Sequence, residues 1–164
     1  MAQTAAAIPF VGGLPLIGGG KTRFQPIFVG DVADAVCAAL DKHDAQGRVY
    51  ELGGPRSYSF KELMQFIVRE TQRDVPLISL PFFLAQPLGF LMEWGFKLVP
   101  FADAPLTSDQ VSMLKRDNVV GADANAGAIT DLGVANLESV EAVVPSYLWR
   151  FRAYGQFQTT QSGA

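Results

Sequence analysis

Apolar residues recur at helical spacing in several stretches of the chain. Val32, Val36 and Leu40 stand behind Asp31, whose carboxylate we expect to cap the first turn of a helix. Ser59 and Thr107 each stand three residues before a Glu or Gln, which is the capping-box spacing of a helix start. The same pattern predicts a helix over 82–98, bent near Pro87 because proline interrupts helical hydrogen bonding, and a last helix from Ser139 to about Trp149.

Short runs of β-branched and aromatic residues predict strands between these helices. They cover 21–30, 48–52 and, less regularly, 75–80. Pro26 lacks a backbone N–H, so it places the first strand at a sheet edge or delays its pairing. Residues 1–20 are broken by proline and glycine, and we expect a loop there. The alternation predicts an α/β fold with too few strands for a complete doubly wound sheet.

The composition is more apolar than that of an ordinary soluble domain. Hydrophobic residues make up 49% and charged residues 18%, with a mean hydropathy of +0.18. This balance predicts a large buried interface or contact with a membrane. Residues 77–101 are the most apolar stretch, but prolines and charges interrupt them, so we expect an interfacial or buried hairpin and not a membrane span. Its aromatic residues favour a core, with a hydrophobic docking surface as the alternative.

Charge and cysteine content exclude several classes of function. The net charge is −3 and there is no block of Lys or Arg, so nucleic-acid binding is not expected. A single cysteine and a single histidine exclude an internal disulfide and a Cys/His metal site. Cys37 lies in an apolar run and is expected to be buried, whereas His43 lies between Lys42 and Asp44 and is expected to be solvated.

Two glycine-rich stretches invite comparison with phosphate-binding loops. Gly12-Gly13 and Gly18-Gly19-Gly20 lack the G-x-G-x-x-G spacing, and the second stretch precedes a predicted strand where a phosphate loop would follow one. Gly20-Lys21-Thr22 has the end of a P-loop, but Pro15 stands where its first glycine should be. We therefore expect no self-contained nucleotide site.

Arg23 and Gln25 are the candidate site residues, close to a strand edge after the glycines. A guanidinium at that place could bind an anionic substrate group bidentately. An ordinary surface or interface ion pair is the competing interpretation of Arg23. No residue of this chain is predicted to be catalytic.

Four stretches together carry a resemblance to a known family. They are the run from Gly18 to Ala35, Tyr50 to Pro55, Tyr58 to Leu63, and Pro105 to Asn118. The chain resembles the C-terminal half of extended and atypical short-chain dehydrogenases. It is most similar to the NAD(P)H-binding accessory-subunit family of respiratory complex I (NADH:ubiquinone oxidoreductase) and its bacterial relatives. The resemblance extends over about 14–154.

The resemblance implies a partial Rossmann-like domain. Residues 1–155 would be the substrate-side half of an NAD(P)-binding parallel sheet with a small, mostly helical substrate lobe, and 156–164 a disordered tail. Arg23 would face the substrate cleft, with Gln25 close to substrate or cofactor. The family's nucleotide fingerprint and its Tyr-x-x-x-Lys pair do not occur in this sequence. NAD(P) is therefore implied by the family but is not expected to bind to this chain alone.

Two functions remain open on the sequence. In the first, the chain is a fragment of a protein resembling a complex I accessory subunit, without catalysis of its own and with complex I subunits as partners. In the second, it is the substrate-binding half of an NAD-dependent epimerase/dehydratase or reductase. Either way a cut sheet exposes an edge, so we expect a missing N-terminal half or a homo-oligomer as partner. The expected location is cytoplasmic or the inner face of the cell membrane, with peripheral membrane contact through 77–101.

Overall fold

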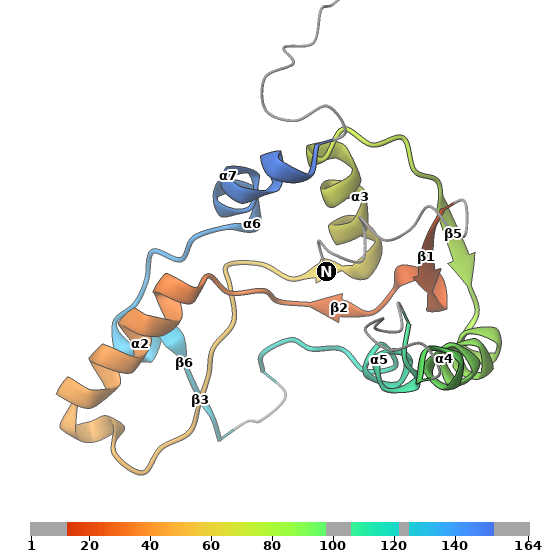
Figure 1. Ribbon diagram of the computed structural model, residues 1–164. Coiled ribbons are helices and arrows are strands. Elements are labelled where there is room, and N and C mark those ends of the chain that lie inside the picture. The colour runs from red at the N-terminus through yellow and green to blue at the C-terminus, as the bar shows by residue number, and fades with distance from the viewer. Residues whose placement is uncertain (1–12, 98–105, 122–124, 153–164) are drawn as a thin grey trace, which may run out of the picture. The chain divides into compact units, whose positions relative to one another are not determined.

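The structure is a computed structural model that describes residues 13–97, 106–121 and 125–152 (Figure 1). It is a mixed α/β chain that divides into two compact units. Of the described residues, unit 1 contains 13–22, 59–97, 106–117 and 148–152. Unit 2 contains 23–58, 118–121 and 125–147. The predicted tail, 156–164, lies outside the described residues.

Unit 1 is built on a parallel pair of strands. Strand β1 (Leu14–Ile17) pairs with β5 (Leu77–Leu80), with Leu14 opposite Leu77 and Ile17 opposite Leu80. The expected loop over 1–20 is therefore wrong at 14–17. Pro15 is tolerated because a strand with a single neighbour can leave one backbone position unpaired. A 3-10 turn, η1 (Gly18–Gly20), follows, and its three glycines all have positive φ.

The helices of unit 1 begin where the sequence predicted. Ser59 caps α3 (Phe60–Glu70) and Thr107 caps α5 (Ser108–Met113), each in a complete capping box. The long helix α4 (Phe82–Lys97) contains Pro87, as expected, and lies against α5. These elements enclose a small core of Ile17, Ala85 and Val111, supported by Leu80, Phe82, Leu106 and Leu114.

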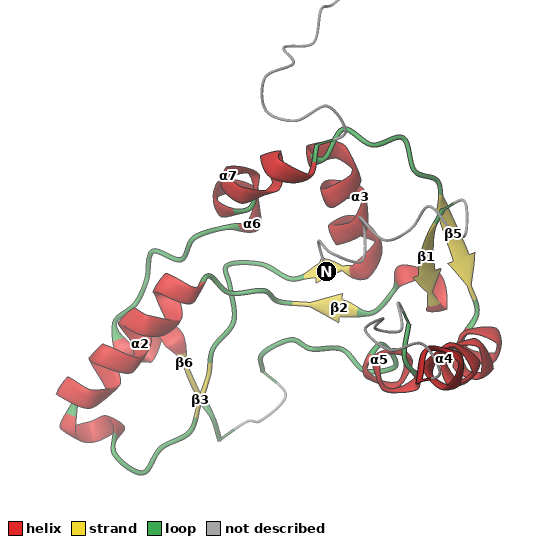
Figure 2. Ribbon diagram, viewed as in Figure 1, coloured by secondary structure: helices red, strands yellow, loops and turns green. Residues whose placement is uncertain are grey.

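Unit 2 has shorter strands than predicted, and Figure 2 shows how much of the chain is loop. Strand β2 (Arg23–Phe24) pairs with β4 (Tyr58–Ser59), of which Tyr58 belongs to unit 2, and β3 (Tyr50–Glu51) runs parallel to β6 (Gly127–Ala128). The predicted strand over 21–30 stops at Phe24, because Pro26 follows and α2 (Val29–Asp41) has already begun by Val29. Among the described residues each sheet has two strands, so a continuous Rossmann-like sheet is not shown.

Asp31 does not cap α2. Phe28 occupies the N-cap position without a side-chain hydrogen bond, and Asp31 lies in the first turn, 5% exposed. Its Oδ2 accepts a hydrogen bond from the Glu138 N–H at 3.0 Å. Asp31 therefore has a structural role, but it connects α2 to the segment around Glu138 and does not cap its own helix. The core beside it contains Ala35, Ala45, Ile129 and Leu132, the last two from η3 (Ile129–Leu132).

Three further expectations have clear outcomes. Cys37 is exposed, so its predicted burial is wrong, whereas His43, in the turn η2 (His43–Ala45), is exposed as predicted. The last helix is capped by Ser139 as expected but is broken into α6 (Val140–Val143), α7 (Pro145–Leu148) and η4 (Trp149–Phe151), because Pro145 has no N–H to continue it. Within the described ranges, no helix has the length and apolarity needed to cross a bilayer.

Candidate functional site

The two site residues predicted from the sequence both have partners within unit 2. The exposed Arg23 donates from Nη2 to the Ser57 Oγ at 2.6 Å. Gln25 uses both ends of its amide: Nε2 donates to the Gly54 carbonyl at 2.8 Å, and Oε1 accepts from the Val120 N–H at 3.3 Å. Gln25 therefore connects the loops that contain Gly54 and Val120 to the segment after β2. The role of Arg23 and Gln25 near a substrate stays a prediction.

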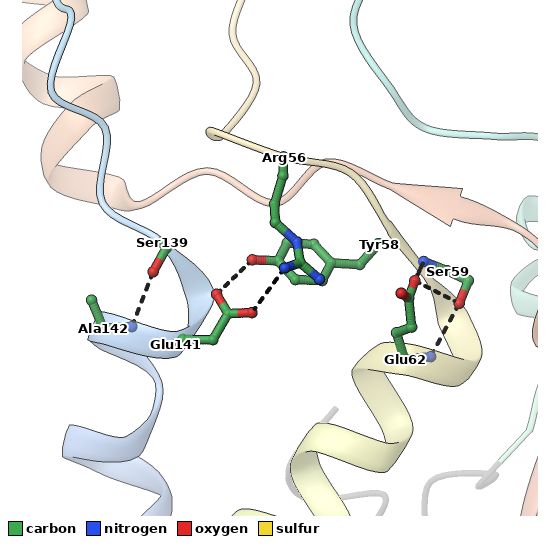
Figure 3. Close-up of polar contacts among 7 residues, drawn as sticks. All are labelled: Arg56, Tyr58, Ser59, Glu62, Ser139, Glu141 and Ala142. Carbon is green, nitrogen blue, oxygen red and sulfur yellow. Dashed lines mark hydrogen bonds and ion pairs between the residues drawn. The ribbon is translucent and has the colours of Figure 1, made fainter.

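The most distinctive polar group of unit 2 is centred on Tyr58 (Figure 3). The residue is only 3% exposed, and its hydroxyl donates to Oε2 of Glu141 at 2.7 Å. Burial, reinforced by the neighbouring carboxylate, raises the pKa of Tyr58 to about 12. The tyrosine therefore remains protonated throughout the physiological range and acts as a donor.

Arg56 completes the group from the loop before β4. Its guanidinium carbon lies 4.2 Å from the centre of the Tyr58 ring, a cation–π distance, and its Nη1 lies 3.7 Å from the Glu141 Oε1. The hydrogen bond from Tyr58 holds the pKa of Glu141 below its usual range, with a smaller contribution from Arg56. Because the Arg56 and Glu141 side chains are 57% and 44% exposed, water screens their ion pair and it contributes little stability.

Helix ends fix the backbone on which these side chains stand. Ser139 caps α6 by accepting from the Ala142 N–H at 3.2 Å, which places Glu141 in the first helical turn. A carboxylate is favoured there by the helix dipole. On the other side, Tyr58 directly precedes Ser59, whose hydroxyl accepts from the Glu62 N–H at 3.1 Å and whose N–H donates to the Glu62 carboxylate at 2.6 Å. Both residues thus come from backbone set by local capping.

The chemistry of this group differs from that of a dehydrogenase tyrosine. Such a tyrosine needs its pKa lowered by a neighbouring lysine so that it can transfer a proton. Here burial and a carboxylate act in the opposite direction, and the residue four positions after Tyr58 is Glu62. The arrangement is suited to holding β4 and α6 together and not to proton transfer near neutral pH.

Unit 2 also has an open groove of ≈ 280 Å³. Its walls are 26–29, 138–140 and the side chains of Val143, Val144 and Tyr147. The lining is mostly apolar, and among the described residues its charged member is Glu138. A phosphate would find no cation there, so the groove does not suit a nucleotide. In the same described ranges, no cluster of His, Cys, Asp and Glu could hold a metal ion.

Comparison with known proteins identifies relatives from three organisms that all have the same protein name. The chain is 41% identical over 116 residues to NADH dehydrogenase (ubiquinone) 1 alpha subcomplex subunit 9, mitochondrial, of Arabidopsis thaliana, a match covering 68% of this chain and 27% of the plant protein. The chain is similar to a subunit of NADH dehydrogenase. Proteins of the same name from Rattus norvegicus and Mus musculus are 31% identical over 135 residues, which is 79% of this chain and 34% of each relative. No family model matches the chain.

These relatives support the predicted resemblance to the complex I accessory-subunit family. The chain spans about a third or less of the length of the curated relatives that it matches.

The Tyr58–Glu141 pair was not found from the sequence. Its members are 83 positions apart, and nothing local to either one indicates the other. The one local signal is that Glu141 comes two residues after Ser139, which is typical of an acid in the first turn of a helix and does not indicate a tyrosine partner.

Proposed function

We propose that this chain is an accessory, non-catalytic region of a protein of the complex I accessory-subunit family, with complex I subunits as its partners. The observation that carries the proposal is the 41% identity, over 116 residues, to a protein named as an NADH dehydrogenase subunit. The chemistry around Tyr58 agrees with it, because a buried tyrosine with its pKa raised to about 12 is poorly suited to exchange its proton near neutral pH.

In this proposal the nucleotide belongs to a Rossmann-like, short-chain dehydrogenase-type sheet to which this chain contributes the substrate-side half. Parallel sheets are normally larger and covered on both faces, whereas each described sheet here has two strands. The further strands would come from an N-terminal half or from a second copy of the chain. NAD(P) would then require residues that this sequence lacks.

Association is tested in the organism's own cells with a tagged full chain. Membranes are solubilised in mild detergent, separated by native electrophoresis and stained for NADH dehydrogenase activity. We expect the tag to migrate with the active band. Migration of the tagged chain only as a small species, while the active band is intact, would contradict the accessory function.

The cofactor part of the proposal has its own test. NADPH is titrated into the purified chain, and tryptophan and nicotinamide fluorescence are followed. We expect no saturable change. A micromolar Kd would show that the chain holds the cofactor by itself.

The alternative is the substrate-binding half of an epimerase/dehydratase or reductase. It is favoured by a single feature, the exposed Arg23, whose guanidinium lies at the edge of β2 beside Ser57. Under this alternative, a sugar nucleotide should protect the chain against thermal unfolding, and Arg23→Gln should abolish that protection.

A further inference from the structure

Helix α4 packs through its smallest residues. Ala85 is fully buried, and Gly89 lies so close to α5 that an added Cβ would be 3.1 Å from the Ser108 backbone nitrogen. This side of the helix therefore approaches α5 backbone to backbone, which is possible only where side chains are minimal. Phe82, at the start of α4, packs in the same core, but six other large side chains of the helix lie on a different side.

They point outward. With about 100° per residue, six bulky positions of α4 fall in one continuous arc of roughly 160° on the side away from Ala85, whereas Phe82 and Met92 fall on the Ala85 side. All six are substantially exposed: Phe83 at 73%, Leu84 at 48%, Leu88 at 38%, Phe90 at 55%, Leu91 at 68% and Trp94 at 60%. We call this surface the outer face of α4. A helix of a soluble domain normally does the reverse and buries its large apolar side chains.

The outer face has little with which to recognise a protein. Apart from the Trp94 indole, its side chains contain no hydrogen-bonding group, and the residue between them at position 87 is a proline. A protein–protein interface usually includes several hydrogen bonds and a polar rim. Hydrocarbon requires neither. Phe90 and Trp94, whose ring centroids lie 6.3 Å apart, are residue types that are frequent where a helix enters the edge of a bilayer.

The positively charged side chain of Lys115 lies beside the outer face of α4. Gln86 precedes Pro87 on α4, next to the Phe90 side of the outer face, and its Oε1 accepts a hydrogen bond from the Lys115 Nζ at 2.8 Å. The acceptor is a neutral amide, so the positive charge of Lys115 is not cancelled by it. Arg116 follows directly, and both side chains are exposed. Basic residues at the margin of an apolar surface are attracted to anionic lipid headgroups.

We propose that the outer face of α4 binds the surface of an anionic lipid bilayer, with Lys115 and Arg116 meeting lipid phosphates. The inference deepens the proposed function, on which it rests, by naming what the apolar segment around α4 contacts. The helix would lie in the plane of the membrane, with its Ala85 and Gly89 side still packed on α5.

The test is co-flotation of the purified full chain with vesicles. One set contains phosphatidylcholine alone and the other phosphatidylcholine with phosphatidylglycerol. We expect the chain to float with the anionic set. The double variant Phe83→Ser and Leu91→Ser should lower the partition coefficient at least about tenfold, because each change removes a large apolar side chain from the lipid. Lys115→Gln with Arg116→Gln should lower the partition coefficient about fivefold for each charge removed, and only with the vesicles that contain phosphatidylglycerol.

A matched control lies on α2 in unit 2. Val36 and Leu40 are 51% and 80% exposed, so Val36→Ser with Leu40→Ser removes comparable exposed apolar surface elsewhere. This control should float like the parent chain, and far-UV circular dichroism should show all variants folded.

Three results would overturn the inference. The first is that the parent chain does not float with anionic vesicles. The second is that the α2 control variant loses as much vesicle binding as the α4 variant. The third is that no vesicle binding is found while light scattering shows that the Phe83 and Leu91 changes convert an oligomer to a monomer. The last result would show that the face pairs with a second copy. Because vesicle binding is measured on the isolated chain, its failure is distinguishable from failure to migrate with the NADH dehydrogenase band.

Discussion

Removing one oxygen atom tests the role assigned to Tyr58. Tyr58→Phe retains the buried ring and its contact with Arg56 but deletes the O–H that donates to Glu141 at 2.7 Å. A hydrogen bond to a charged acceptor contributes about 1.5–3 kcal/mol, and the low end applies here because water can replace the hydroxyl at a carboxylate that is 44% exposed. We expect a loss of about 1.5 kcal/mol, which corresponds to a fall of about 0.7 M in the urea midpoint.

The pH dependence gives this prediction its specificity. The pKa of Glu141 is lowered in the folded state, so its contribution is present above the ordinary value of 4.5 and is lost as pH falls from 4.5 through the lower pKa of the folded state. The pKa of Tyr58 is raised from 10.0 to about 12, so its contribution is present below pH 10 and is lost as pH rises from 10 to 12. The difference between parent and variant should therefore be largest near pH 7 and shrink in both directions.

The assay is urea unfolding followed by far-UV circular dichroism at acidic, neutral and alkaline pH. Tyr147→Phe is the matched control, because it removes a hydroxyl from a tyrosine of the same unit that is 43% exposed. The control should leave the urea midpoint nearly unchanged. A Tyr58→Phe effect that is the same at every pH, or no larger than that of Tyr147→Phe, would refute the reasoning.

Two further predictions concern backbone and thiol. Gly54→Ala should lower the free energy of unfolding by about 3 kcal/mol, because its Cβ would lie 1.9 Å from the Pro26 carbonyl oxygen. Gly47→Ala, at φ +71° with open space around it, should lower it by only about 1 kcal/mol. Equal urea midpoints for the two variants would show that the added Cβ at position 54 does not overlap with Pro26. The exposed Cys37 should react with Ellman's reagent at nearly the same rate in buffer and in urea, and labelling only after unfolding would show that it is buried.

Helix starts could be predicted because the information for them is local. The capping boxes at Ser59 and Thr107 span three residues each, and both are present in the structure. Asp31 shows the limit of the same reasoning. A carboxylate near a helix start was expected to cap it, but a backbone N–H 107 positions away, that of Glu138, uses the carboxylate instead.

Strands and burial were harder, because they depend on partners distant in the sequence. Leu14–Ile17 forms a strand only because Leu77–Leu80 is beside it, and the flanking glycines and Pro15 suggested a loop. Cys37 and the aromatic residues of α4 lie in apolar stretches, which predicts a core. Several of them face outward, because hydrophobicity all round a helix does not reveal which side is packed.

The division of the chain into its two units has a consequence for how the protein can be made and cut. Neither unit is a continuous stretch of sequence. Hydrogen bonds close each one across the chain, from Thr22 to Leu114 in unit 1, 92 positions apart, and from Lys42 to Asp131 in unit 2, 89 positions apart. The core of unit 1 therefore cannot close until Leu114 has left the ribosome, and the core of unit 2 cannot close until Leu132 has done so. No single cut releases one unit intact, so truncation series would damage both cores, and point variants are the appropriate way to dissect this protein.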